Sequence, residues 1–261
     1  MLEMFKELIQ YREVLFALTW RDIKIRHKQT IMGFLWVIFM PMVVVLSGIV
    51  VKKAMAMFSG RPLELSQIVS VSVKALPWAF FVASIKFSVN SLVGNMSLLN
   101  KIYFPREIFP LSALITQLFD FTIAISVLTV ILTIAKIGIG VNLLWLPLLL
   151  LLLILFTAGL GLILSCANLF FRDVKYIVDV ILTFGIFFTP VFYEAKMLGK
   201  LGTVLLLNPV GALLENINNV VVLHQPPDYL WLAYSAVWAV GGFFGAWFIF
   251  HKTEPIFAEN V

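Results

Sequence analysis

Three ionisable side chains lie inside long apolar stretches of this sequence, where their charges could serve transport or bind a partner. They are Lys86, Asp120 and Asp179. A charge in hydrocarbon is costly, so such a residue faces a polar path, a substrate or an oppositely charged group. Capping or pairing near the cytoplasmic side is the alternative for both carboxylates, and we favour it for Asp179. For Lys86, a structural ion pair and a place on a substrate path stay equally open.

A basic segment lies directly before the first long apolar run. Its charged residues are Arg21, Lys24, Arg26 and Lys28. At headgroup level they could meet anionic lipids or the phosphates of a substrate. Basic residues concentrate on the cytoplasmic side of membrane proteins, so this segment predicts a cytoplasmic N-terminus.

Aromatic residues make up 14% of the chain. Because aromatic faces stack on sugar rings, some could line a sugar path. The candidates are Phe80, Phe81, Phe187, Phe188, Phe192 and Tyr193. For any single one of them, packing against lipid or in the interfacial aromatic belt is the favoured interpretation.

Several chemistries find no support in the sequence. There is no G-x-x-x-x-G-K-[ST] phosphate loop, so ATP hydrolysis cannot be assigned to this chain. No H-E-x-x-H motif or Cys/His cluster predicts a metal site, and no Ser/His pattern predicts a hydrolase. With Cys166 as the single cysteine, no internal disulfide forms. We therefore expect no catalytic residue, no metal and no cofactor in this chain.

The composition indicates a polytopic all-α membrane protein. The 261 residues are 61% hydrophobic and 13% charged, with a mean hydropathy of +1.01. Soluble domains carry about 25% charged residues. The net charge of +5 is explained by topology and lipid headgroups rather than by nucleic acid. The first residues lack the pattern of a cleavable signal peptide, so the N-terminus is expected to be retained.

Two parts of the chain follow from the pattern of apolar residues. Residues 1–30 are expected to form a cytoplasmic part, with an amphipathic helix over 2–20 that lies in the membrane interface. A soluble helix packed on a neighbouring domain is the alternative. Residues 31–261 are expected to form the transmembrane domain. Six spans are predicted at roughly 31–51, 75–93, 111–135, 143–168, 176–192 and 229–250, the first interrupted by Pro41.

The stretch 201–223 is long enough to span but is broken by Asn208 and Pro209. Asn followed by Pro is typical of a helix N-cap and first helical position. We predict two short external helices here, re-entrant or interfacial. If the stretch spanned, the chain would have seven spans and an external C-terminus.

Five segments, in order, resemble the ABC-2 type polysaccharide export permeases. Residues 20–36 read WRDIKIRHKQTIMGFLW and are followed by Pro41, and residues 95–110 read NMSLLNKIYFPREIFP. The other segments are FFRDV at 170–174, LNP at 207–209 and EPIFAE at 254–259. One departure is His27, where the family usually has Tyr. The closest resemblance is to the membrane subunits of O-antigen exporters (Wzm type), with teichoic-acid and capsule exporters as near relatives.

This resemblance implies a six-span half-transporter in the bacterial cytoplasmic membrane, with both termini cytoplasmic. It implies a homodimer that works beside two copies of a separate ATPase, which binds ATP and Mg, and that moves a lipid-linked polysaccharide. It makes Phe171, Arg172 and Asp173 candidates for docking that ATPase. It makes Tyr103, Phe104, Pro105 and Arg106 candidates for a cytoplasmic entrance or gate, with Arg106 a candidate for recognising a pyrophosphate.

Two alternatives remain. An ABC-2 exporter of drugs or other lipids would share this topology without a wide channel. An ATP-independent carrier or enzyme for lipid-linked sugars would instead depend on Asp120 or Lys86.

Overall fold

The fold is a bundle of long helices. The computed structural model describes residues 2–28, 35–59, 65–99, 104–134, 138 and 140–257, and within these residues there is no strand. The longer helices are α1 (Leu2–Gln10), α2 (Arg12–Lys28), α3 (Leu35–Ser59), α4 (Leu65–Gly94), α6 (Ile108–Ile134), α7 (Leu146–Phe170), α8 (Val174–Gly185), α10 (Pro209–Val221) and α11 (Tyr229–Phe257). Short pieces are α5 (Met96–Leu99), η1 (Val141–Trp145), η2 (Ala195–Leu198) and α9 (Lys200–Leu206).

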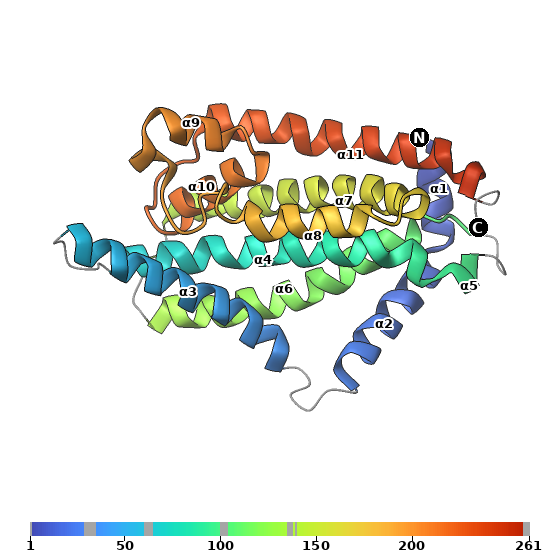
Figure 1. The fold of residues 1–261 in the computed structure, drawn as a ribbon, viewed down its shortest axis with the longest axis horizontal. Helices are drawn as coiled ribbons and strands as arrows, with labels where there is room; N and C mark the ends of the chain where they lie inside the picture. Colours follow the sequence, from blue (N-terminus) through green and yellow to red (C-terminus); the bar gives the residue numbers. More distant parts are fainter. Residues whose placement is uncertain are drawn as a thin grey trace.

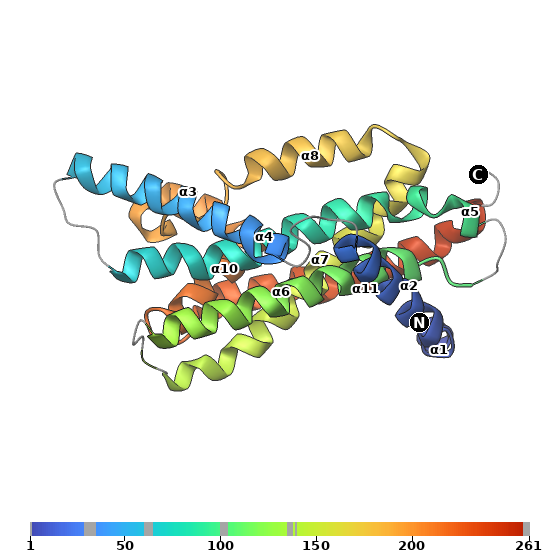
Figure 2. The same ribbon diagram turned by 90° about the horizontal axis from the view of Figure 1, so that it is seen from below.

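Helix α4 is the centre of the bundle. It packs against α3, α6, α7, α8 and α10, and α11 packs along α7 (Figure 1). Seen from below, α3 and α8 lie along one face of α4, with α6 on the other (Figure 2). We call the end that holds α1, α5 and the α7–α8 turn the α5 end, and the opposite end, with α9 and α10, the α10 end. The apolar core therefore forms around α4 along the length of the bundle.

Two glycines of α7 let its neighbours approach closely. A Cβ at Gly159 would lie 3.0 Å from the Cα of Phe243 on α11, and one at Gly161 would lie 3.0 Å from the Ser88 side chain on α4. Small residues allow such backbone approach between apolar helices. The Gly241-x-x-x-Gly245 pattern of α11 has no such partner, since a Cβ at either glycine meets nothing within 4 Å.

Four helices are long and apolar enough to cross a membrane, counted over the described residues. They cover Ser66–Gly94, Ile108–Thr133, Val141–Phe170 and Tyr229–Pro255. The pair α9 and α10, bent by 108°, would be a fifth if it counted as one span. The prediction of a membrane-embedded helical protein is thus confirmed, whereas this count is lower than the six spans that were predicted.

The predicted fifth span, 176–192, is not one continuous helix. Helix α8 is 12 residues long and ends at Gly185, which corresponds to about 18 Å, short of the roughly 30 Å hydrocarbon core. The chain turns after it, with i→i+3 hydrogen bonds from the Phe187 and Phe188 amides, and Pro190 then prevents the helix from resuming, because it has no backbone N–H to donate. The Tyr193 hydroxyl donates to the Phe187 carbonyl oxygen at 2.8 Å, which holds the turn closed.

Two other predicted boundaries also need correction. Helix α3 continues through position 41 and beyond Val51 to Ser59, with the Lys52 side chain 5% exposed. Helix α4 begins at Leu65, ten residues before the predicted start. The predicted spans stop at position 51 and start at position 75, next to Lys52 and Lys74, but protein atoms cover both lysines. The predicted start of α3, 31–34, lies outside the described residues.

The stretch 201–223 forms two short helices, as predicted. Asn208 caps α10, its side-chain oxygen accepting from the Val210 amide at 3.1 Å, and Pro209 occupies the first helical position. Helix α10 is buried along most of its length. Asn216 ties α10 to the start of α11, because its side-chain oxygen accepts a hydrogen bond from the Asp228 amide at 2.7 Å.

Candidate functional site

The segment before α6 is held against the end of α11. Phe104 and Pro105 are buried, and Arg106 is half-buried. The Arg106 amide donates to Oε1 of Glu254 at 3.0 Å, and its guanidinium donates to the Glu254 carbonyl oxygen at 3.0 Å. Three of the four candidate gate residues are therefore packed at the α5 end, while Tyr103 lies outside the described residues.

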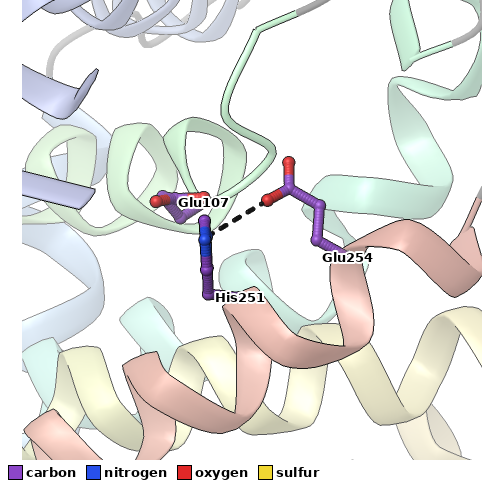
Figure 3. Close-up of side chains that lie close together, drawn as sticks. All are labelled: Glu107, His251 and Glu254. Carbon is purple, nitrogen blue, oxygen red and sulfur yellow. Dashed lines mark ion pairs between the residues drawn. The ribbon is translucent and has the colours of Figure 1, made fainter. Parts of the chain in front are cut away.

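Next to this contact, three titratable side chains converge. Glu107, His251 and Glu254 each place a possible ligand atom within 4.8 Å of the others (Figure 3). Glu107 is fully buried, and its Oε1 accepts from the Trp247 indole at 3.3 Å. Sequence analysis did not group these residues because 148 positions separate Arg106 from Glu254. The only sequence signal is that Trp247, His251 and Glu254 recur at helical spacing on one face of α11.

The candidate docking residues form an exposed turn between α7 and α8. Phe171, Arg172 and Asp173 are all exposed, and the Phe171 side chain is 70% so. Asn168 fixes the turn from within, since its amide donates to the Val89 carbonyl at 2.9 Å and its oxygen accepts from the Lys175 amide at 3.2 Å. An apolar ring is thus exposed on a turn that two hydrogen bonds of Asn168 hold in place.

The basic segment divides into paired and exposed charges on α2. Arg26 pairs with Asp120 of α6 and stacks over the Phe87 ring of α4 at 4.1 Å. Arg21 pairs with its neighbour Asp22 at 2.8 Å and donates to the Asn95 side chain at 2.9 Å. Lys24 and Lys28 are exposed, with the Lys24 ammonium 5.4 Å from the Trp20 ring centre. Arg21 and Arg26 therefore anchor α2, and Lys24 and Lys28 remain accessible.

Each charge predicted inside a span has a partner. Lys86 of α4 pairs with Asp179 of α8 at 3.0 Å, and Asp120 pairs with Arg26. The structure therefore shows Lys86 and Asp179 in one ion pair, and the position of Asp179 near the cytoplasmic side stays a prediction.

The six candidate aromatics separate by burial. Phe80 stacks on Phe121 with ring centres 4.7 Å apart, and Phe81 contacts Trp78 with centres 5.6 Å apart. Together with Phe192 they lie in the core. Phe187 and Phe188 are 64% and 68% exposed. Tyr193 is half-buried, and burial raises the pKa of its hydroxyl, so that it stays a neutral donor to Phe187.

One ionic contact has no counterpart among the predicted site residues. Lys74 is 1% exposed, donates to the Tyr193 carbonyl at 2.6 Å and pairs with Glu215 of α10 at 3.4 Å. The same Glu215 oxygen accepts from the Ala195 amide at 3.0 Å. Lys74 lies one residue before the predicted second span, 75–93, and was not among the candidate site residues. The signal available in the sequence was Glu215, a charged residue within the apolar stretch 201–223, which needs a partner of opposite charge such as Lys74.

Comparison with known proteins gives one family and several relatives. The family described as ABC-2 type transporter matches residues 13–221. The O-antigen export system permease protein RfbA of Myxococcus xanthus is 28% identical over 269 residues, covering 100% of both chains. Two proteins of the same name from Klebsiella pneumoniae are each 26% identical. One covers 77% of this chain and 77% of the relative, and the other 95% and 94%.

Proposed function

The chain belongs to the ABC-2 type transporter family, and from this premise we propose that it is the permease subunit of an ATP-driven exporter of an O-antigen-like, lipid-linked polysaccharide. The observation that carries the proposal is similarity to an O-antigen export permease along the whole of both chains. The membrane-spanning helices and the paired charges inside them agree with a transport subunit.

Energy would come from a separate ABC ATPase that binds ATP and Mg. We assign its docking to Phe171, Arg172 and Asp173, because these side chains are exposed at the tip of a turn fixed by Asn168. An exposed aromatic ring beside opposite charges suits a partner with an apolar pocket and a charged rim. Movement of the partner would reach α7 and α8 directly, since the turn joins them.

The substrate's pyrophosphate would first meet the exposed lysines of α2. Lys24 and Lys28 are free of the contacts that anchor the helix through Arg21 and Arg26. Arg106 would act later, at the α5 end, where its guanidinium already lies beside Glu254. Among the six candidate aromatics, Phe187 and Phe188 are the exposed rings that a sugar chain could touch.

We further propose six crossings of the bacterial cytoplasmic membrane, in which α3 is one, and α8, too short by itself, crosses together with the chain that follows it up to α9. Two such chains would form a homodimer that carries two ATPase copies. One chain supplies one half of a pore, so a two-fold assembly closes the path. In this arrangement the α5 end faces the cytoplasm, in agreement with the basic residues of α2.

The test is purification of the chain from its native membranes in mild detergent, with the co-purifying ABC ATPase identified and quantified. We expect the ATPase at a one-to-one ratio, and we expect Phe171→Ala to lower the co-purified amount at least tenfold. Phe248→Ala, at another exposed ring, 57% exposed on α11, is the matched control and should retain the ATPase. Equal ATPase recovery with both variants would overturn the docking assignment.

Export is tested in cells by surface display of the lipid-linked polysaccharide. Deletion of the gene should leave the glycan inside the cytoplasmic membrane, and the wild-type gene should restore display. The variant Lys24→Gln/Lys28→Gln should lower display while the ATPase still co-purifies. Normal display in the deletion strain would refute the proposed function.

A further inference from the structure

Glu107, His251 and Glu254 form a compact cluster where α6 begins and α11 ends, as Figure 3 shows. The Glu107 carboxylate is fully buried, and its Oε2 has no hydrogen-bond partner among the described residues. A buried carboxylate oxygen without a partner costs free energy. The nearby Glu254 carboxylate adds like-charge repulsion. The cluster is therefore incomplete as a set of protein groups and calls for a positive species at its centre.

The hydrogen bonds around the cluster leave one oxygen of each carboxylate available. Oε1 of Glu107 accepts from the Trp247 indole at 3.3 Å, and Oε1 of Glu254 accepts from the Arg106 amide at 3.0 Å. Oε2 of Glu254 lies 3.5 Å from Nδ1 of His251, which is too long for a hydrogen bond. Such outer contacts orient carboxylate ligands in metal sites.

The donor set selects the kind of ion. One imidazole nitrogen and two carboxylate oxygens suit a divalent transition metal, whereas Mg²⁺ and Ca²⁺ prefer oxygen ligands alone. Zinc bonds of about 2.0–2.2 Å place ligand atoms roughly 3–4 Å apart. The three ligand atoms already lie within 4.8 Å of one another, so small side-chain rotations would close the set. Two carboxylates also balance the charge of a divalent ion in a buried setting.

We propose that Glu107, His251 and Glu254 bind one divalent transition-metal ion, with Zn²⁺ as the best match to this donor set. Three protein ligands leave a fourth position for water. The His251 side chain is 42% exposed, so the ion can reach the site from that edge. The bound ion ties the Arg106 segment to α11 at the α5 end. This inference does not depend on the transported substrate.

The test uses the full chain, purified in detergent through a tag without histidines, treated with a chelator and then given Zn²⁺. Elemental analysis after removal of free metal should find about one zinc per chain. The variants Glu107→Gln and His251→Ala should lower zinc occupancy at least tenfold at the same free concentration. Glu107→Gln keeps the side-chain size and the oxygen that accepts from Trp247. His224→Ala is the matched control and should keep full occupancy.

A second readout separates loss of binding from loss of folding. Zn²⁺ should raise the Tm of the wild-type chain and of His224→Ala, but not of Glu107→Gln, and each variant should elute as the wild type does on size exclusion. Co²⁺ should give visible absorption bands with the wild type that Zn²⁺ removes. Wild-type protein that retains no zinc, or Glu107→Gln that retains as much as wild type, would overturn the proposal. In that case a proton shared between the carboxylates fills the cluster.

Discussion

Lys74 carries an ammonium group on a side chain that is almost fully enclosed, and its partners come from two other segments. Its contacts with the Tyr193 carbonyl and the Glu215 carboxylate fix α10 and the turn before η2 to α4. Removing one member of a buried pair leaves the other charge uncompensated, which costs more than the pair itself contributes. The enclosed pair therefore makes the α10 end sensitive to single substitutions.

We expect Lys74→Met to destabilise the protein by about 3 kcal/mol, because Glu215 then keeps, among the residues that the structure describes, only the Ala195 amide as a hydrogen-bond partner. The double variant Lys74→Met/Glu215→Met should regain much of that loss, since two apolar side chains replace the charged pair. Thermal unfolding in detergent measures both. A single variant as stable as wild type would show that the pair is not coupled in this way.

At the scale of elements, α2 is attached to the bundle by apolar packing around Leu18 and by the charged side chains Arg21 and Arg26. Arg26 reaches Asp120 and Phe87 on two different helices. Arg26→Gln should loosen α2 by about 1–2 kcal/mol, which corresponds to roughly five- to thirtyfold faster amide hydrogen exchange within α2. Lys24→Gln changes an exposed charge on the same helix and should leave the exchange unchanged. Unaltered exchange in Arg26→Gln would place the attachment elsewhere.

The close contact between α7 and α11 depends on Gly159, which has no side chain. Gly159→Ala would place a Cβ 3.0 Å from the Phe243 backbone, and backbone cannot move aside as a flexible side chain can. We expect a loss of about 1–3 kcal/mol, typical of overpacking. Gly241→Ala lies in the same region of the bundle with open space around it and should be neutral. Equal Tm values for the two variants, compared in the same detergent, would contradict the close approach.

Much of this element level was predictable from apolar periodicity, but the residues opposite each charge were not. The predicted spans 31–51 and 75–93 leave Lys52 and Lys74 just outside, because lysines usually lie at the ends of spans. Both helices continue past them, since other protein groups cover these lysines. The aromatics show the same limit, because Phe80 in the core and Phe187 on the surface have the same hydropathy. A linear pattern states how apolar a residue is and leaves open which neighbour encloses it.

Only part of the candidate site was predictable, because a linear pattern does not show which distant residues meet in the fold. The exposed turn at Phe171 follows from its charges between two apolar runs. The Glu107 cluster needs the fold, because α11 returns to the start of α6 only after the chain has passed through α7, α8 and α10. Cluster residues that are distant in sequence carry no spacing signal.

At the scale of the whole molecule, the two ends of the bundle should face opposite sides of the membrane. In a Cys166→Ser background, Phe171→Cys would place a thiol at the α5 end and Val141→Cys one at the α10 end, where these side chains are 70% and 84% exposed. An impermeant thiol reagent added outside intact cells should label Val141→Cys alone. Opening the membrane should allow labelling of Phe171→Cys. Labelling of both from outside would exclude the proposed crossing.

Helix α4 bears two lysines that form ion pairs with different helices. Lys86 holds Asp179 of α8, and Lys74 holds Glu215 of α10. They are twelve positions apart on α4, about 18 Å along the helix axis, with Pro77 between them. Helix α4 therefore links two ion pairs, one to α8 and one to α10. A force on the α7–α8 turn would move α8 and, through the Lys86–Asp179 pair, α4. Helix α4 would pass that movement to α9 and α10 at the α10 end through Lys74 and Glu215.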